Sequence, residues 1–409
     1  MTARKLLLFI LSFCPLALVA QVSDESVQQA EHVFSLLLHH QADSLYALLD
    51  ESVKAQLSRE QLEGGLKQVE LMMGSYQRHG EWERKPDAQD EVLMSVVDFE
   101  GGQLACVVSF NDTRHIQGLR IMPLPKEQAE MKIPLPADAV EVDDTVRTGA
   151  DIKLPCSVVL SGRSARPPMV VFVHGSGPTD RNETVLANRP FLDLSRQLAE
   201  RGISSLRYDK RTFVYPKPVD TMDDETILDA LSAVQLARTY ADCVYLMGHS
   251  LGAMLAPVIA SRIRLDGIVM MAAPARDLAD VVQEQLEYLS PAETTAEQKE
   301  AAIGQMRQQS PHYFQPQHQV ETAQGLHIPM LILQGERDYQ VTMRDFRLWQ
   351  QALDGQPMVS FASYPALNHL FLKGEGKSTP QEYSIPDTIP AQVADDIARF
   401  ITQHNSFNK

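Results

Sequence analysis

The sequence predicts an α/β protein, in which a mostly parallel sheet with helices on both faces is preceded by a small α+β domain. Beyond Ala139, short apolar runs alternate with stretches of helical periodicity, which is typical of a parallel sheet joined by crossover helices. Before Pro123 a helical region comes first and strand-like runs follow it. At 409 residues the chain is too long for one ordinary hydrophobic core, so two domains are expected.

Residues 1–20 have the pattern of a signal peptide. Arg4 and Lys5 precede an apolar run over residues 6–19, and Ala20 precedes a polar segment. The run is short against the roughly 20 apolar residues of a bilayer span. We therefore expect export to the periplasm or the medium, with no stable membrane anchor once the signal is removed.

Residues 21–123 form the predicted α+β domain. Residues 26–74 have a helical pattern with one apolar face, and strand-like runs follow at 92–97, 104–110 and 116–122. This layout resembles the small cone-shaped domain of the NTF2-like superfamily. It contains no catalytic motif, and the face of its strands is a candidate for pairing into a homo-oligomer. The apolar face of the helical pattern consists of Leu62, Leu66, Val69 and Met73.

A linker rich in proline and charge at 124–138 separates this domain from the second one, at 139–409. Residues 275–327 form a helical, Gln- and Glu-rich insertion that is too long for a bare loop between strands. We expect it to cap the carboxyl edge of the sheet, where such sheets bind ligands. Strands are predicted at 151–160, 169–173, 203–208, 243–247, 267–272, 329–333 and 359–364, and helices at 191–201, 223–240 and 391–401.

The motif G-H-S-L-G at 248–252 follows the apolar run 243–247 and precedes an apolar helical stretch. This is the pattern of a strand-to-helix turn that holds a nucleophile at its apex, which makes Ser250 the candidate nucleophile. A serine hydroxyl needs a base to take its proton and an acid to orient the base. The turn after strand 329–333 offers Asp338, with Glu336 as the second choice. His369 follows the last strand and is the predicted base, whereas His404 lies in the polar C-terminal tail.

Acyl transfer also needs N–H donors for the developing oxyanion. The Leu251 N–H at the start of the helix is the first predicted donor. Ser176, in the loop after strand 169–173, is the second, and Gly177 is its alternative. His174 and His249 are expected to shape these turns rather than to transfer protons.

These residues together resemble the α/β-hydrolase superfamily over residues 140–409. The stretches H-G-S-G-P-T-D-R at 174–181 and R-Y-D-K-R-T at 207–212 are similar to a group of bacterial carboxylesterases with an extended H-G-S-G-P-x-D-R motif. The chain departs from that pattern at Asn182 and Ala253. Four charged residues of these stretches are expected to form an ion-pair network that rigidifies the loops: Asp180, Arg181, Asp209 and Arg211.

The sequence thus favours an exported serine carboxylesterase that acts on small to medium acyl esters. A serine peptidase or aminopeptidase on the same fold is the alternative, and a non-catalytic binding protein is a remote one. The acyl length and the alcohol are not encoded in any motif.

The net charge and the cysteine spacing limit the partners and cofactors that we expect. The net charge of −16, from 37 Lys and Arg against 53 Asp and Glu, argues against nucleic acid. No cysteine pair has metal-ligand spacing, so neither a metal nor a cofactor is expected. Three cysteines follow the signal region, and the sequence leaves their pairing open, although Cys243 is expected to be a buried thiol. The three are Cys106, Cys156 and Cys243.

Overall fold

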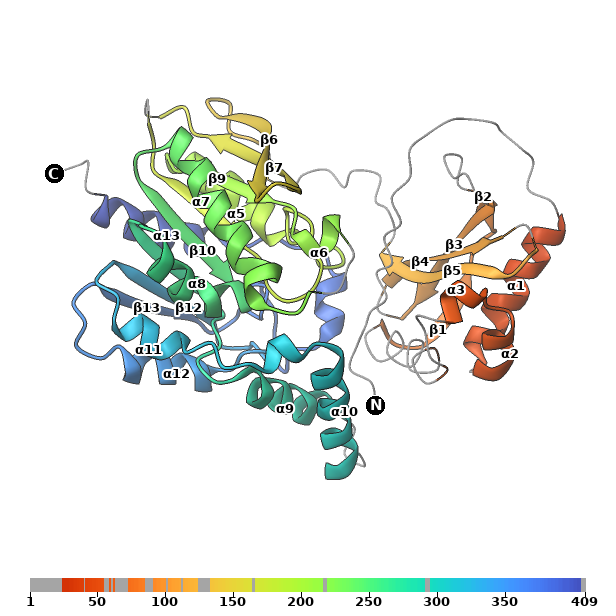
Figure 1. The fold of residues 1–409 in the computed structure, drawn as a ribbon. Coiled ribbons are helices and arrows are strands. Elements are labelled where there is room, and N and C mark those ends of the chain that lie inside the picture. The colour runs from red at the N-terminus through yellow and green to blue at the C-terminus, as the bar shows by residue number, and fades with distance from the viewer. Residues whose placement is uncertain are drawn as a thin grey trace. The chain divides into compact units, whose positions relative to one another are not determined.

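The computed structural model describes most of the chain after residue 23. The described ranges are 24–39, 41–54, 73–84, 91–100, 102–111, 113–123, 133–163, 166–215, 219–290 and 295–405, together with residues 59 and 62. The predicted signal peptide lies outside these residues. The chain divides into two compact units, residues 1–129 and 130–409 (Figure 1).

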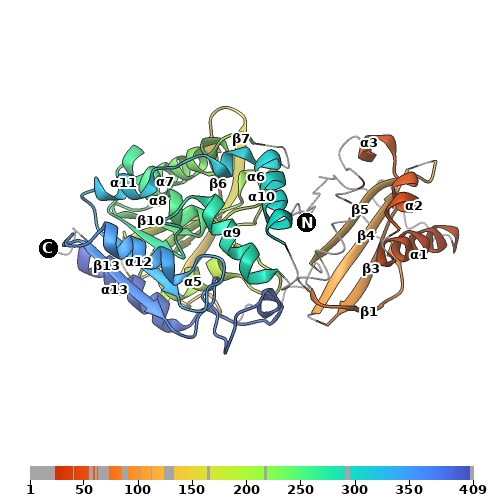
Figure 2. The same ribbon diagram turned by 90° about the horizontal axis from the view of Figure 1, so that it is seen from below.

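The first unit is an antiparallel sheet with short helices. Its strands pair in the order β1-β3-β4-β5, with β2 against β3, and α1 and α2 cover one face of the sheet (Figure 2). The helices are α1 (Asp24–Leu38), α2 (Ala42–Ala47) and α3 (Glu51–Lys54). The strands are β1 (Tyr76–His79), β2 (Glu83–Arg84), β3 (Glu91–Phe99), β4 (Gly102–Phe110) and β5 (Ile116–Pro123).

The predicted small α+β domain is therefore confirmed as a fold class. Three of its strands match the sequence-based prediction, and β1 and β2 were not predicted. Of the four residues of the predicted apolar helical face, Leu62 and Met73 are helical and buried. Leu66 and Val69 lie outside the described residues.

The second unit is built on a sheet of eight strands within the described residues, in the order β13-β12-β11-β10-β8-β9-β7-β6. The neighbours from β13 to β9 pair in parallel, while β7 is antiparallel to both β6 and β9. The strands are β6 (Val140–Thr148), β7 (Ile152–Leu160), β8 (Met169–Val173), β9 (Ser204–Tyr208), β10 (Val244–His249), β11 (Gly267–Met271), β12 (Met330–Gly335) and β13 (Val359–Tyr364).

Alternate residues of the central strands face two separate hydrophobic cores. In β8, Val171 packs with one core and Phe172 with the other. A strand buried on both faces reads as a continuous apolar run, which is why these strands were predictable from sequence. The first core includes residues of α7, α8 and α12, and the second includes residues of α5 and α13, so helices cover both faces as predicted (Figure 1).

The helices of the sheet follow the predicted alternation. They are α5 (Pro190–Glu200), α6 (Arg211–Val214), η1 (Asp223–Ile227), α7 (Leu228–Tyr240), α8 (Leu251–Arg262), α12 (Met343–Ala352) and α13 (Ala391–His404). The predicted helix at 223–240 begins with a π-helical turn, η1, before α7 continues it. Helix α12 was not predicted.

Strand β6 was also missed. Its sequence, VEVDDTVRT, alternates apolar and polar residues and carries three acids, and only Val146 is buried. Such a strand at the edge of a sheet has one solvated face and gives a weak apolar signal.

The predicted insertion forms α9 (Leu278–Leu289), α10 (Ala296–Gln309), η2 (Pro311–Phe314) and α11 (Gln319–Gln324). Helices α9 and α10 lie against each other (Figure 2), whereas α11 packs against α8. Tyr288 of α9 stacks on Tyr339 in the loop after β12, with ring centroids 5.1 Å apart. Tyr313 of η2 contacts the loop after β8. The insertion therefore lies at the carboxyl ends of the strands, as a cap does.

Within the described residues, no helix has the length and apolar content needed to cross a membrane.

Candidate active site

Ser250 lies between β10 and α8 in a strained backbone conformation. Its φ of 53° and ψ of −115° are rare for a residue with a side chain, at a cost of roughly 1–3 kcal/mol. Hydrogen bonds hold the turn in place, because Ser250 N–H donates to the carbonyl of Met271 in β11 and its own carbonyl accepts from Met254 N–H, both at 2.9 Å. The predicted elbow is therefore present.

Close approach of the backbone explains both glycines of the motif. A Cβ at Gly248 would lie 2.2 Å from the carbonyl oxygen of Gly252, across the turn. A Cβ at Gly252 would lie 2.2 Å from the carbonyl oxygen of Val173, at the end of β8. Any larger residue would push α8 away from the strands, so G-x-S-x-G is a packing requirement of this turn.

Asp338 and His369 are in direct contact. Nδ1 of His369 donates to Oδ2 of Asp338 at 2.7 Å, and both side chains are buried. Gln334 also donates to Oδ2, at 3.2 Å. The other carboxylate oxygen accepts the backbone N–H groups of Gln340 at 2.7 Å and Val341 at 2.9 Å. The carboxylate is thereby fixed in the orientation in which it meets the imidazole.

Glu336 and His404, the alternative acid and base, form hydrogen bonds to other residues. Glu336 is exposed, and its Oε1 accepts a hydrogen bond from Ser363 at 2.8 Å. Nδ1 of His404 lies at the end of α13, 2.9 Å from the carbonyl of Phe400. Neither residue reaches the Asp338–His369 pair by any hydrogen bond in the described part of the chain.

His249, the residue before Ser250, lies beside His369. The ring of His249, directly before Ser250, lies 4.7 Å from the ring of His369. In the described residues no hydrogen bond occupies the hydroxyl of Ser250 or Nε2 of His369. The Ser250 hydroxyl and Nε2 of His369 therefore have no competing partner among the described residues, and catalytic contacts often form only when a substrate binds.

The two predicted oxyanion donors are Ser176, in the loop after β8, and Leu251, the first residue of α8. A Cβ at Gly175 would lie 3.4 Å from Cβ of Ser250, so this loop runs beside the elbow. Among the described residues no hydrogen bond takes up the N–H of Ser176 or of Leu251. The N–H of Gly177, the alternative donor, points instead to the hydroxyl of Tyr313 at 3.2 Å. The geometry thus favours Ser176 over Gly177.

His249 and Glu183 form a buried pair behind the elbow. Nδ1 of His249 lies 3.1 Å from Oε2 of Glu183, within ion-pair distance when the imidazole is protonated. Burial lowers the pKa of His249, but the Glu183 carboxylate outweighs it, so the pKa is raised. Burial raises the pKa of Glu183, and His249 outweighs it in turn, so that pKa is lowered. Both shifts favour the charged pair.

His174 has a different role in the same loop. Its Nε2 lies 3.1 Å from the carbonyl of Asp180, so this nitrogen carries the proton and donates. Burial lowers the pKa of His174 to about 4, against an opposing effect of Glu183. A neutral, buried histidine that ties two ends of a loop together shapes the turn, as expected from the sequence.

The ion-pair network expected among Asp180, Arg181, Asp209 and Arg211 is wrong for Asp180 and Arg211, which have other partners. Arg181 and Asp209 pair through two hydrogen bonds, of 3.0 and 2.9 Å. Asp180 instead accepts from the backbone N–H of Asn182 and Thr184, which closes a turn. Arg211 pairs with Asp229 of α7, which lies 18 positions later in the chain.

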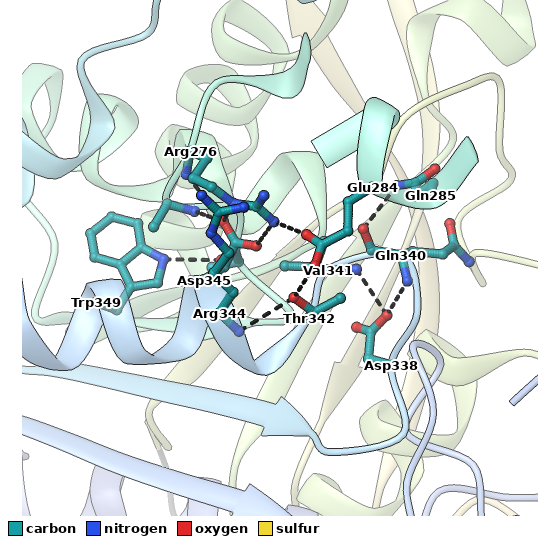
Figure 3. Close-up of polar contacts among 12 residues, drawn as sticks. Arg276, Glu284, Gln285, Asp338, Gln340, Val341, Thr342, Arg344, Asp345 and Trp349 are labelled. Carbon is teal, nitrogen blue, oxygen red and sulfur yellow. Dashed lines mark hydrogen bonds and ion pairs between the residues drawn. The ribbon is translucent and has the colours of Figure 1, made fainter. Parts of the chain in front are cut away.

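The cap is joined to the loop that carries Asp338. Arg276 donates from Nε and Nη2 to the fully buried carboxylate of Asp345, at 3.2 and 2.6 Å, and from Nη2 to Glu284 of α9 (Figure 3). Glu284 accepts from Thr342, and Gln285 donates to the carbonyl of Gln340 at 2.9 Å. The network thus reaches the residue whose N–H binds Asp338.

The three cysteines of the sequence analysis are buried and free of disulfides. Burial raises the pKa of Cys156 to about 12, which keeps its thiol protonated. In the described ranges no group of three or more His, Cys, Asp or Glu side chains is arranged to hold a metal ion.

Comparison with known proteins agrees with this fold. Residues 170–394 match the family described as "Alpha/beta hydrolase family", and residues 30–119 match one described as "Protein of unknown function (DUF3887)". The chain is 35% identical over 383 residues to Esterase EstD of Thermotoga maritima, covering 88% of this chain and 92% of that protein.

Solved structures that resemble the chain include two archaeal esterases. The Pyrococcus furiosus esterase Pf2001 is 17% identical with a TM-score of 0.48, covering 64% of this chain and 91% of that one. A hyperthermophilic esterase of Pyrobaculum calidifontis is 19% identical with a TM-score of 0.46, covering 66% and 87%.

The chain belongs to the α/β-hydrolase family. The resemblance expected from the motifs at 174–181, 207–212 and 248–252 is thereby confirmed.

Proposed function

We propose that the protein is a serine carboxylesterase that cleaves small to medium acyl esters through an acyl-serine intermediate. The observation that carries the proposal is the 2.7 Å contact of His369 with Asp338, together with a strained Ser250 whose hydroxyl has no competing hydrogen bond in the described residues and whose neighbour His249 contacts His369. The identity to Esterase EstD supports an ester as the substrate.

In the proposed reaction Nε2 of His369 takes the proton of Ser250 as its hydroxyl oxygen attacks the ester carbonyl. Asp338 holds the Nδ1–H tautomer and stabilises the imidazolium that forms. The N–H groups of Leu251 and Ser176 receive the oxyanion, and each such donor is worth about 3–4 kcal/mol in this type of reaction. His369 then protonates the departing alcohol, and water, activated by the same base, releases the acid from Ser250.

Graded p-nitrophenyl esters, assayed beside aminoacyl p-nitroanilides, test the substrate class. We expect turnover of the short and medium esters and none of the anilides. Turnover of anilides at comparable kcat/KM would select the peptidase alternative. If neither series were hydrolysed, the non-catalytic alternative would replace both.

We further propose that the protein is exported and that residues 1–20 are removed. The basic start, the apolar run 6–19 and Ala20 support this. Mass spectrometry of the protein recovered from the periplasm or medium of a bacterial host should give a mature N-terminus at Gln21. A full-length chain that stays in the cytosol would contradict the proposal.

A further inference from the structure

Three side chains hold the backbone on both sides of Ser176. Gly175 N–H donates to Oε1 of Glu183 at 2.7 Å, and the Gly175 carbonyl accepts from Nζ of Lys210 at 2.8 Å. Gly177 N–H donates to the hydroxyl of Tyr313 at 3.2 Å. Among the described residues the N–H of Ser176, between these anchors, has no partner. The three anchors thus fix the direction of the one N–H that remains available.

Tyr313 differs from the other two anchors because it comes from the cap. It lies in η2, 136 positions from Gly177 in the chain. Its hydroxyl donates to Oε1 of Glu225 at 2.6 Å. A phenol has a single proton, so once that proton is given to Glu225 the oxygen can only accept from Gly177. Glu225 therefore ensures that the Tyr313 hydroxyl accepts, rather than donates, in its hydrogen bond with Gly177.

Glu225 is buried and held in its ionised form. Nζ of Lys210 lies 2.6 Å from Oε1, and Nε2 of His312 donates to Oε2 at 2.7 Å. Burial raises the pKa of Glu225, but Lys210 and the hydrogen bonds from His312 and Tyr313 outweigh it and hold the pKa at about 2. Burial and the neighbouring carboxylate raise the pKa of Tyr313 well above its usual value, so it stays a neutral phenol.

We propose that Tyr313 is a positioning residue that fixes Gly177, and through it the N–H of Ser176, so that the cap insertion completes the oxyanion hole. This inference rests on the proposed function. It predicts that the hydroxyl of Tyr313 acts on the transition state rather than on substrate binding, because the oxyanion exists only after attack.

The test is Tyr313→Phe in the full chain, assayed with a short p-nitrophenyl ester. We expect kcat to fall by about tenfold to a hundredfold, as misplacement of a donor does, while KM stays within about twofold. The inhibition constant of an alkyl boronic acid, which forms a tetrahedral adduct on serine, should rise by the factor by which kcat/KM falls. If Tyr313 only anchored the cap, Tyr313→Phe would lower the thermal midpoint of unfolding but leave kcat and the inhibition constant of the boronic acid unchanged.

Tyr288→Phe is the matched control. Tyr288 is also a cap tyrosine, but its hydroxyl donates to the carbonyl of Ser378 at 2.8 Å. We expect its kcat to stay within about twofold of the wild-type value. If Tyr313→Phe is too unstable to assay, His312→Phe keeps a ring beside Tyr313 but removes a donor from Glu225, and it should give a smaller loss of kcat in the same direction.

The inference would be overturned by an active Tyr313→Phe protein with wild-type kcat, or by a loss confined to KM. Equal losses in Tyr313→Phe and Tyr288→Phe would overturn it as well. A wild-type chain that hydrolyses no ester would overturn the proposed function and this inference together, so the two failures are distinguishable.

Discussion

Nε2 of His249 donates to the backbone carbonyl of His369 at 2.8 Å, which ties the residue before the proposed nucleophile to the loop of the proposed base. The other ring nitrogen of His249 pairs with Glu183, and Glu183 accepts the N–H of Gly175. One buried pair therefore connects the turn at Ser250, the loop of His369 and the loop that carries Ser176.

The stability that Glu183 contributes should depend on pH. The raised pKa of His249 means that the ion pair is fully formed below the ordinary histidine pKa, about 6.5, and is lost as pH rises through the higher folded value. The lowered pKa of Glu183 means that the pair is fully formed above the ordinary glutamate pKa, about 4.3, and is lost as pH falls through the lower folded value. Asp338 also favours the charged form of His249.

Glu183→Gln should therefore cost most between about pH 5 and 6, on the order of 3–5 kcal/mol for a broken buried pair, and clearly less at pH 9. Guanidinium unfolding of the variant and the wild type at pH 5.5 and pH 9 measures this difference. Glu336→Gln, at an exposed position, is the control and should show no such dependence. A cost that is the same at both pH values would contradict the charged pair.

Asp338→Asn should lower kcat on esters by about 10⁴, because only the acid bonded to Nδ1 of His369 sets the tautomer of the base. Glu336→Gln should stay within about twofold of wild type, since Glu336 bonds to Ser363 instead. Steady-state kinetics on one p-nitrophenyl ester compare them. Losses of similar size would remove Asp338 from its proposed role.

Asp345→Ala should destabilise the hydrolase unit by about 3–5 kcal/mol, because it leaves the charge of Arg276 buried with less compensation. Asp223→Ala is the matched control: its pair with Arg262 is 43% and 40% exposed and should be worth no more than about 1 kcal/mol. Thermal unfolding of the two variants separates the cases. Equal shifts would mean that the anchor of the cap in Figure 3 contributes no more than a surface pair.

The first unit should be dispensable for chemistry on a small ester. A chain that begins near Glu127 keeps all of Ser250, Asp338 and His369 and both cores of the second unit. We expect it to fold and to keep its activity on a soluble short ester, while oligomeric state, measured by light scattering, or discrimination among bulky esters changes. If circular dichroism shows that the truncated chain is folded but it hydrolyses no short ester, the first unit contributes to the active site and the prediction is wrong.

The sequence was sufficient for the central strands and for the strand-to-helix turn at Ser250. Those features depend on local patterns: continuous apolar runs, and glycines where backbones approach within 2.2 Å. Strand β6 was missed because its alternating, acidic sequence gives no such run.

The side-chain partners could not be predicted, because they depend on which elements the fold brings together. Arg211 meets Asp229 rather than Asp209, and Gly177 meets Tyr313 from 136 positions away. The role of Glu183 had one signal in the sequence, an acid placed shortly after the motif 174–181, but nothing in the pattern identified His249 as its partner.

Labelling with a fluorophosphonate, followed by peptide mapping in a mass spectrometer, tests the central claim most directly. We expect one modified residue, Ser250. Ser250→Ala should lose both labelling and ester hydrolysis, and His369→Ala should label far more slowly because the hydroxyl has lost its proposed base. Labelling that persists in Ser250→Ala, or a label mapped to another serine, would contradict it.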